Sequence, residues 1–377
     1  MTNFQNYQVV WKGPVHKASG LGIASRAYVQ ALKRQGVNIK VGTGLNGGVT
    51  NRKNKVLIYH YPPHTINFKK ERANFNHIIL NTVWETSRIP NRWVPYMNKY
   101  DAVCVPSQQN KQAMLNSGVR VPIFIVPHGV NTSMYSPANK PIHLREANGK
   151  FAFVSVFGFQ HRKNPEALLR AYWEEFSAAD HVVLVIKTNG YAAYENEQWI
   201  RNKIQRYKVR LGIRKQTAPI ILTARHLNAQ QLKGIYTRGQ AFVLPTRGEG
   251  VGLPFLESLA SGTPVIATGW GGHMDFLNSS NSFLVPYKLS NPATRMNSKQ
   301  SISREFRSLF AQKGQRWAEV DIRSLRHKMR LAYSNPLLCK EKGRKGRQDV
   351  LKLSWDRAGY SLKQAIEKVM LTRKYQS

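Results

Sequence analysis

One segment, residues 241–277, limits what this chain can fold into more than any other. Its sequence is AFVLPTRGEGVGLPFLESLASGTPVIATGWGGHMDFL, and it opens with an apolar strand at 241–244 that runs into a glycine loop. A helix with an apolar face follows, with Pro254 at its first position, and Gly262 ends it before a second apolar strand at 264–267. Strand, glycine loop, helix and strand make a βαβ unit. This order predicts a parallel sheet that binds ligands beyond the carboxyl ends of its strands.

Two carboxylates frame the glycine loop. Glu249 precedes the glycines, and Glu257 is expected in the first turn of the helix. Free N–H groups at a helix N-terminus attract phosphate, and Gly250 and Gly252 would let the backbone approach it closely. Each carboxylate can accept hydrogen bonds from the vicinal hydroxyls of a sugar or a ribose. Phosphate and polyol contacts side by side suggest a sugar nucleotide, although Glu257 could merely complement the helix dipole and Glu249 could be a solvated loop residue.

The frame GEGVGLPFLESLASGTPVIAT, with seven residues between the two carboxylates, closely resembles the signature of retaining family 4 glycosyltransferases of the GT-B fold. In that family the first Glu contacts the donor sugar and the second contacts the ribose, so the resemblance implies these roles for Glu249 and Glu257. It also implies an α/β fold of two facing Rossmann-like domains with parallel sheets. A C-terminal helix would cross back onto the first domain.

The chain of 377 residues is long enough for two such domains. We expect an acceptor-side domain at 1–138, joined by the C-terminal helix at 355–377, and a nucleotide-sugar-binding domain at 139–354. The polar segment 136–150 is the predicted linker. Apolar runs separated by turns or helical patterns predict strands at 9–11, 39–41, 56–59, 77–80, 102–105, 123–126, 151–157, 182–187, 220–222 and 282–285.

Basic residues dominate the charge of the chain. Lys and Arg number 57 against 20 Asp and Glu, a net charge of +37, which favours an anionic partner. Residues 1–150 hold 20 basic and 4 acidic residues, so the excess is spread over both domains and is not typical of a dedicated nucleic-acid stripe. The open alternatives are an anionic acceptor, an anionic membrane surface, nucleic acid, or a compositional bias.

The sequence contains few features that indicate a cellular compartment. The N-terminus, MTNFQNYQVVW, has no basic region followed by an apolar stretch, so we expect no signal peptide. Apolar runs such as 182–186 are far below the ~20 residues of a membrane span. Cys104 and Cys339 show no disulfide or metal spacing. We expect a cytoplasmic protein, with peripheral contact at the inner membrane face as an option.

Two basic residues, Arg162 and Lys163, precede an expected helix at 165–176. Cations at this place would neutralise a diphosphate and stabilise it as a leaving group. The family has an Arg directly after a glycine and a later Lys. Here Phe159 follows the glycine, so Arg162 would substitute for that Arg while Lys163 is the closer match. Without the frame, a surface-exposed basic pair would be the simpler interpretation.

Further donor contacts are implied only by the resemblance. In the family the loop matching 224–227 packs on the nucleotide base through backbone groups, so its side chains do not distinguish the bases. A first glycine loop, at Gly20 and Gly22, would lie near the transferred sugar, although a tight turn explains it equally well. The implied donor site comprises Gly20, Gly22, Arg162, Lys163, Arg225, Leu227, Glu249, Gly250, Val251, Gly252, Leu253 and Glu257.

His60 ends the strand in IYHYPPH, where it could donate a hydrogen bond to a sugar hydroxyl or to an oxygen with developing charge. It matches the second His of a family element whose first His is Ile58 here, and His64 is a rival for the role. We expect catalytic roles for His60, Lys163 and Glu249. A histidine that satisfies local backbone in a proline-rich turn is the alternative.

The acceptor is expected at the segment VWETSRIPNRW, where Trp84, Glu85 and Arg88 resemble the acceptor side of the family. An aromatic ring beside a carboxylate suits a sugar, although Trp84 and Trp93 could equally be core residues. The expected function is transfer of a hexose-type sugar, with retention, from a UDP-, GDP- or ADP-linked donor to an acceptor hydroxyl. No metal and no permanently bound cofactor are expected. A polyanion- or nucleic-acid-binding protein, or a DNA-modifying glycosyltransferase, is the alternative.

Three expectations concern the region after the motif. Residues 288–302 are polar and are predicted as a loop, and 317–333 as the start of an amphipathic helix because Val320, Ile322 and Leu325 have helical spacing. The run 340–347 is predicted as a basic turn.

Overall fold

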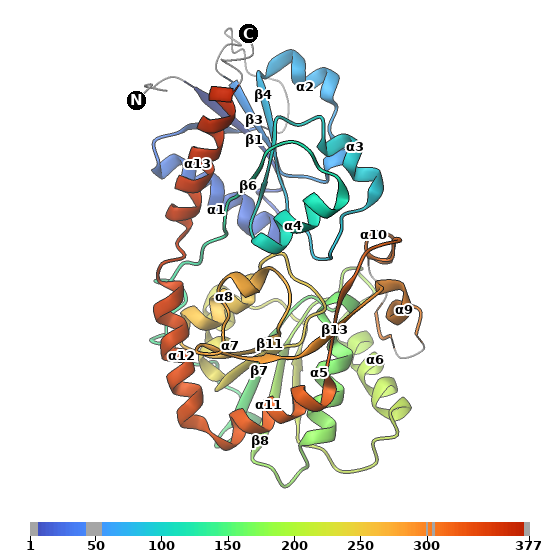
Figure 1. Cartoon of the computed structure of the whole chain (residues 1–377). Helices are drawn as coiled ribbons and strands as arrows, with labels where there is room; N and C mark the ends of the chain where they lie inside the picture. Colours follow the sequence, from blue (N-terminus) through green and yellow to red (C-terminus); the bar gives the residue numbers. More distant parts are fainter. Residues whose placement is uncertain (1–6, 43–54, 299–300, 304–305, 373–377) are drawn as a thin grey trace. The chain divides into compact units, whose positions relative to one another are not determined.

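The computed structural model describes residues 7–42, 55–298, 301–303 and 306–372. The chain divides into two compact units, Met1–Gly129 together with Leu353–Ser377, and Val130–Lys352 (Figure 1). In the described residues each unit holds a six-stranded sheet, and all strand pairs in both sheets are parallel. The predicted α/β class with two parallel sheets is confirmed. The division predicted at 138/139 stays a prediction.

The first unit has the strand order β2-β1-β3-β4-β5-β6. Its strands are β1 (Gln8–Lys12), β2 (Asn38–Val41), β3 (Lys55–Tyr59), β4 (His77–Asn81), β5 (Ala102–Val105) and β6 (Ile123–Ile125). Its helices are α1 (Gly20–Arg34), α2 (Phe68–Asn74), α3 (Val94–Met97), α4 (Gln108–Ser117) and α13 (Trp355–Thr372), with 3-10 turns η2 (Pro63–Thr65) and η3 (Asn91–Trp93). The order reverses between β1 and β3, which makes the ends of these two strands the switch point where open parallel sheets bind ligands.

The last helix of the chain packs on the first unit. Residues of β1, the apolar face of α1 and the apolar face of α13 share one buried cluster, in which Trp11, Tyr28 and Leu362 are fully buried. The α13 helix lies beside α1 (Figure 1). The C-terminal helix therefore belongs to the N-terminal unit, as the sequence predicts.

The second unit has the strand order β12-β11-β10-β7-β8-β9, with the switch point between β7 and β10. Its strands are β7 (Phe151–Val156), β8 (Val182–Lys187), β9 (Ile220–Thr223), β10 (Ala241–Leu244), β11 (Val265–Thr268), β12 (Ser282–Val285), β13 (Tyr287–Ser290) and β14 (Trp317–Val320). Its helices are α5 (Pro165–Glu175), α6 (Glu197–Arg210), α7 (Ala229–Arg238), α8 (Leu253–Ala260), α9 (Pro292–Met296), α10 (Arg307–Phe310), α11 (Ile322–Ser334) and α12 (Pro336–Val350), with 3-10 turns η4 (Arg145–Ala147), η5 (His161–Lys163) and η6 (Gly272–Asp275).

The strands of both parallel sheets lie within one residue of their predicted ends, but three predictions beyond them are wrong. Residues 288–302 are not simply a loop: most of β13 and all of α9 lie in this range, and residues 299–300 fall outside the described part. Residues 317–320 are strand β14, which pairs antiparallel with β13, and the helix begins only at Ile322. Residues 340–347 belong to helix α12.

The expected linker at 136–150 is partly packed against the second unit, since Ala147 is buried and Ile142 N donates to Gly234 O at 2.9 Å.

Two glycines let α12 lie directly on α8, the helix of the motif. A Cβ on Gly343 would lie 2.0 Å from Gly262 O, and one on Gly346 would lie 2.5 Å from Leu259 Cδ2. Gly262 follows α8 with a φ of +76°, a conformation that favours glycine. At these two glycines the backbone of α12 therefore approaches the motif helix more closely than a side chain would allow.

Gly343→Ala is expected to destabilise the protein by about 1–3 kcal/mol, because the methyl group would overlap a backbone carbonyl. Helix propensity alone predicts the opposite sign, a gain of roughly 0.5–1 kcal/mol. Gly20→Ala is the control, since a Cβ at Gly20, the first residue of α1, meets no atom within 4 Å. Urea unfolding checks both variants, and a stabilised Gly343→Ala protein would contradict the close packing.

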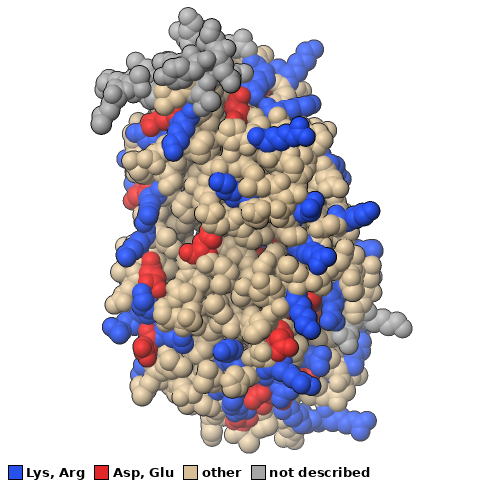
Figure 2. Space-filling view, viewed as in Figure 1, with Lys and Arg blue, Asp and Glu red and all other residues tan. Residues whose placement is uncertain are grey.

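Charge is dispersed over the surface. Figure 2 shows Lys and Arg side chains scattered across the visible face among uncharged residues, with no single basic stripe on that face. Among the described helices, none has both the length and the apolar character needed to cross a membrane.

Candidate active site

The switch point of the second unit brings two loops together, one after β7 and one after β10. Arg247 N donates to Arg162 O at 2.8 Å, which ties the loops through their backbones. The Thr246 hydroxyl lies 3.2 Å from Arg162 O, and Thr268 Oγ1 donates to Thr246 O at 2.7 Å. The predicted site residues Arg162, Lys163 and Glu249 all lie on these loops.

Asn164 sets the position of the two cations. It has a φ of 58° and a ψ of 48°, a left-handed conformation that asparagine tolerates better than most residues, and it joins η5 directly to α5. Its Oδ1 accepts from Ala167 N at 3.2 Å and caps the helix. Arg162 and Lys163, the last two residues of η5, are therefore fixed just before the N-terminus of α5.

Glu249 is held by both cations. Lys163 Nζ lies 2.6 Å from Glu249 Oε1, and Arg162 Nη1 lies 3.2 Å from Glu249 Oε2. The Thr246 hydroxyl adds a contact of 2.9 Å to Oε1. Glu249 is 4% exposed, so the three charges form one buried group. The sequence placed the cations on the diphosphate and did not predict their contact with this carboxylate.

The cations decide the charge of this group. Burial opposes ionisation of Glu249, but Lys163 and Arg162 outweigh it and lower the pKa of the carboxyl to about 2. Burial lowers the pKa of the neighbouring His273, whose Nε2 lies 2.7 Å from Thr268 O. Glu249 is therefore an anion at neutral pH with both oxygens engaged by positive charge.

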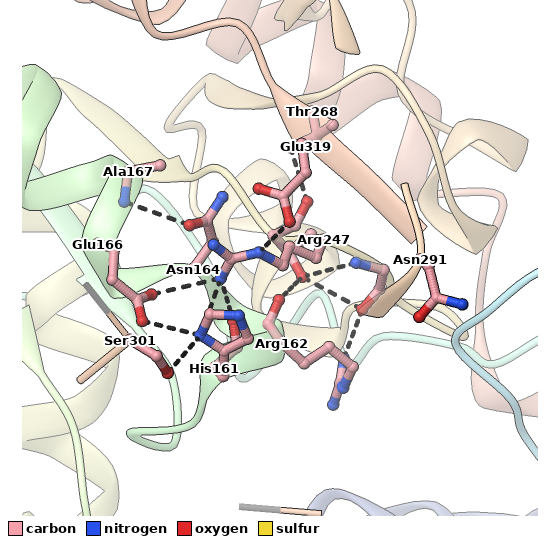
Figure 3. Close-up of polar contacts among 12 residues, drawn as sticks. His161, Arg162, Asn164, Glu166, Ala167, Arg247, Thr268, Asn291, Ser301 and Glu319 are labelled. Carbon is pink, nitrogen blue, oxygen red and sulfur yellow. Dashed lines mark hydrogen bonds and ion pairs between the residues drawn. The ribbon is translucent and has the colours of Figure 1, made fainter. Parts of the chain in front are cut away.

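A second buried network holds the loop from the side (Figure 3). Arg247 Nε donates to Glu319 Oε1 at 2.8 Å, and its Nη1 lies 3.3 Å from Glu166 Oε2 and also donates to His161 O. His161 Nδ1 lies 2.8 Å from Glu166 Oε1. Burial opposes ionisation of Glu166, but His161 and Arg247 lower its pKa to about 2.

This network ties the antiparallel pair of β13 and β14 to the Glu249 loop. Ala318 N, in β14, donates to Arg247 O at 2.8 Å, and the Arg247 guanidinium lies 5.6 Å from the Trp317 ring centroid. Phe310, from α10, lies 5.9 Å from the Arg162 guanidinium in the same way. Sequence reasoning missed Arg247, Glu166 and Glu319. Arg247 stands in the motif two residues before Glu249, but nothing local marks Glu319, which lies 72 residues away from Arg247 along the chain.

The turn into α8 matches the glycine loop expected from the sequence. Gly252 is the N-cap with a φ of +83°, and a Cβ there would lie 2.5 Å from Phe255 Cδ2, so a side chain is excluded. Gly250, Val251 and Leu253 complete the turn. Pro254 is the second helical residue, one later than predicted. Glu257 is the fifth, beyond the first turn, so it does not complement the helix dipole as a first-turn carboxylate would.

The expected base-binding loop follows β9. Leu227 is buried and Arg225 is exposed. Ala224 N donates to Glu197 Oε2 at 2.8 Å, so this amide is already used within the protein. The roles of Arg225 and Leu227 stay predictions.

In the first unit, His60 rather than His64 lies at the switch point. His60 follows β3, its N donates to Lys12 O at 2.7 Å, and its Nδ1 lies 2.7 Å from Ser25 Oγ. Its ring meets Trp11 edge-on at 5.3 Å between centroids. His64 instead stacks on Trp93 at 5.7 Å. Burial lowers the pKa of His60 to about 3, so its imidazole is neutral at physiological pH.

His60 should make stability fall in mild acid. Its folded pKa of about 3 lies below the unfolded value of 6.5, so the unfolded chain binds more protons between these values. The contribution is complete above pH 6.5 and is lost as the pH falls toward 3; at pH 5 the loss is about 2 kcal/mol. Urea unfolding at pH 7.5 and pH 5 should show a smaller loss in His60→Gln than in the parent. The exposed His226→Gln is the control, and equal losses in all three proteins would refute this origin.

The remaining residues of the first unit have local partners. A Cβ on Gly22 would lie 2.0 Å from Lys17 O, and Gly22 N donates to Ser19 Oγ at 3.2 Å, so a tight turn already explains this glycine. Gly20 meets no such constraint.

Of the predicted acceptor residues, Trp84 is buried at 3% exposure, and its Nε1 donates to Arg88 O at 2.6 Å. Its ring packs edge-on against Trp93, which is the core arrangement left open above. Glu85 is half-buried and Arg88 is exposed. Their acceptor role stays a prediction.

Within the described parts of the chain, no three His, Cys, Asp or Glu side chains gather where they could hold a metal ion. Cys104 and Cys339 are both buried free thiols.

Comparisons with known proteins identify a similar family and similar folds. Residues 148–296 match a family model described as Glycosyl transferases group 1. Alpha-monoglucosyldiacylglycerol synthase of Streptococcus pneumoniae is 26% identical over 182 residues, which are 46% of this chain and 38% of that protein. The chain thus spans well under half the length of this curated relative.

Solved structures match over nearly the whole chain. Sucrose-phosphate synthase from Thermosynechococcus elongatus has a TM-score of 0.68 at 15% identity, covering 97% of this chain and 100% of its own. The HepE protein of Anabaena, solved in complex with UDP and glucose, has a TM-score of 0.64 at 10% identity, covering 96% and 100%. At these identities the likeness shows the shared GT-B fold.

Proposed function

We propose that this chain, a member of the group 1 glycosyl transferases with the GT-B fold, transfers a hexose-type sugar from a nucleotide-sugar donor to an acceptor hydroxyl with retention of anomeric configuration. One observation carries the proposal. At the switch point of the second unit, Glu249 is held by Lys163 and Arg162 beside the glycine turn that opens α8. The carboxyl edge of this sheet would then present a carboxylate to the sugar hydroxyls and two cations to the diphosphate.

The cations would stabilise the leaving group. Lys163 and Arg162 both carry their positive charge next to Glu249, at the carboxyl edge of the sheet. Negative charge that develops on the departing diphosphate would be met by Lys163 and Arg162 in a buried setting, where such charges act strongly. The N-terminus of α8, which begins at Leu253, adds the positive end of its helix dipole to this field.

Retention by same-face attack fits the state of Glu249 better than a double displacement does. A double displacement needs a nucleophilic carboxylate beneath the anomeric carbon. Both oxygens of Glu249 are engaged by cations, and its pKa of about 2 marks a weakly basic and hence weakly nucleophilic group. We therefore propose that the leaving phosphate takes the acceptor proton, and that neutral His60 donates a hydrogen bond to the transferred sugar.

The donor is proposed to be linked through UDP, GDP or ADP, and UDP is the first choice because the structurally similar HepE protein was solved with UDP and glucose. Lys163 and Arg162 would supply the charge that a divalent metal provides elsewhere, so transfer is proposed to be metal-independent.

An anionic acceptor is proposed from the net charge of +37. The Streptococcus pneumoniae relative is named as a glycolipid synthase, which favours a membrane glycolipid over a cell-wall polymer or polysaccharide. The protein would then act in the cytoplasm, with peripheral contact at the inner membrane face. The dispersed charge seen in Figure 2 gives no specific support to a nucleic-acid-binding function.

A thermal-shift panel tests the donor proposal. UDP, GDP, ADP and their sugar conjugates are added in EDTA at two salt concentrations, to the parent and to Glu257→Ala. A ligand that binds only the folded state raises the melting temperature by mass action. We expect one nucleotide series to raise it in the parent, with most of the shift lost in the variant.

Other outcomes would change the assignment. A shift that appears only with added Mg²⁺ or Mn²⁺ would remove metal independence. No shift with any nucleotide, together with a salt-sensitive shift on DNA, would favour a polyanion-binding protein.

A further inference from the structure

Glu257 has an environment unlike that of Glu249. The Tyr236 hydroxyl, from α7, donates to Glu257 Oε2 at 2.6 Å. The Tyr135 hydroxyl, from the segment that opens the second unit, also hydrogen-bonds to this carboxylate. The two tyrosine rings meet edge-on with centroids 5.7 Å apart. Glu257 is therefore held by two neutral donors that come from different parts of the sequence.

No ion pair to Glu257 occurs among the residues that the structure describes, whereas Glu249 has two cations. Burial raises the pKa of Glu257, which shows that its charge is poorly compensated. A carboxylate offers about four acceptor positions, and the tyrosines take two. Glu257 is only partly buried, so the remaining positions are open to hydroxyl donors from a ligand.

We propose that Tyr135 and Tyr236 are positioning residues that fix the Glu257 carboxylate for the vicinal hydroxyls of the donor ribose, so that this tyrosine pair selects ribonucleotides over deoxyribonucleotides. This inference rests on the proposed function, in which Glu257 contacts the ribose. The two hydroxyls of a ribose would supply the donors that this carboxylate lacks.

Both tyrosines are also held by contacts that do not involve Glu257. Tyr236 is fully buried, its ring stacks on Phe242 at 5.8 Å, and its carbonyl accepts from Thr263 Oγ1 at 2.8 Å. The Tyr135 carbonyl accepts from Arg347 Nη1 at 3.1 Å.

Arg347 lies on α12, and it also donates to Thr132 O and Ala260 O, at the segment of Tyr135 and the end of α8. Carboxylate and tyrosines are thus held by one framework before any ligand arrives. Such preorganisation lowers the entropic cost of binding.

The test uses Tyr135→Phe and Tyr236→Phe, which remove only the hydroxyls. Tyr172→Phe is the matched control, because Tyr172 is also fully buried and donates to Pro219 O at 2.9 Å, in a contact that does not involve Glu257. Calorimetry measures the Kd of each protein for UDP, 2′-deoxy-UDP, 3′-deoxy-UDP and 2′,3′-dideoxy-UDP. The same series with GDP or ADP is used if the parent prefers that base.

We expect each tyrosine variant to weaken UDP binding about 10-fold, as for a lost hydrogen bond to a charged group, and to change 2′,3′-dideoxy-UDP binding less than about twofold. The preference of the parent for ribose over its deoxy forms should shrink accordingly. In turnover, the donor KM should rise while kcat stays near the parent value. Tyr172→Phe should keep the parent preference.

Equal weakening of UDP and the dideoxy analogue would overturn the inference, because it would assign the tyrosines a structural role only. Unchanged UDP affinity in both variants would overturn it too. These results differ from failure of the proposed function itself, in which the parent protein would bind none of UDP, GDP and ADP.

Discussion

Lys163→Ala is expected to lower kcat about 10²- to 10³-fold while changing the donor Kd only a few-fold. The size is that of removing one preorganised donor from a site where negative charge develops. Lys163 is buried beside Glu249, so its ammonium is fixed before the donor binds, and its effect should be largest when the phosphate leaves. Steady-state transfer assays and calorimetric donor binding measure the two quantities separately.

Lys208→Ala is the control for this variant. Lys208 is a partly buried lysine in the same unit whose Nζ donates to Thr217 Oγ1 at 2.7 Å, and no role is assigned to it. Its kcat should stay within about twofold of the parent. Transfer by Lys163→Ala at the parent rate would remove Lys163 from the mechanism.

Arg247→Met is expected to destabilise the protein by about 3–5 kcal/mol, because Glu166 and Glu319 would lose their shared partner while Glu166 stays buried. Methionine keeps much of the volume, so the cost comes from charge rather than from a cavity. Urea or guanidinium unfolding at pH 7 provides the measurement.

Arg201→Met is the matched control for the charge effect. Its ion pair with Glu197 at 2.7 Å is far more exposed than the pairs of Arg247, so its loss should cost about 1 kcal/mol or less. Adding Glu319→Gln to Arg247→Met should restore part of the lost stability, since one unpaired carboxylate is removed. A double variant less stable than Arg247→Met would show that Glu319 is not the partner that matters.

The sequence predicted elements whose signal is local and failed where the signal is not. Most strands of the two parallel sheets contain a continuous apolar run, such as 182–186, and they form where expected. Strand β13 is mostly exposed and has no such run; it exists because β14 pairs with it from 27 residues further along the chain. The run 340–347 was predicted as a basic turn from its charge, whereas it is helical and its glycines, Gly343 and Gly346, contact α8.

Helical spacing misled the prediction at 317–320. Ile322 and Leu325 have helical spacing, but Val320, two residues before Ile322, does not continue it. Asp321 Oδ1 accepts from Ser324 N at 2.7 Å and caps a helix that begins after it. The capping residue, rather than the apolar period, marks the start of this helix.

The residues of the candidate site could be proposed from the sequence, but the contacts among them could not. Lys163, Arg162 and Glu249 follow from the motif and from its resemblance to known enzymes. Their mutual pairing spans 86 residues of chain, and no spacing rule contains it. The two tyrosines at Glu257 carry no motif signal of their own, since a hydroxyl becomes specific only through its neighbours.

The antiparallel pair of β13 and β14 extends the functional part of this protein beyond the motif. Ala318 and Glu319 hold the backbone and side chain of Arg247, two residues before the carboxylate assigned to the sugar. A change in β13 or β14 that shifts Ala318 or Glu319 would therefore change the position of Glu249, although no residue of the motif is altered. When segments are exchanged between related proteins, the β13–β14 pair and the glycine loop should therefore be exchanged together. The two segments are far apart in the sequence but act as one structural unit.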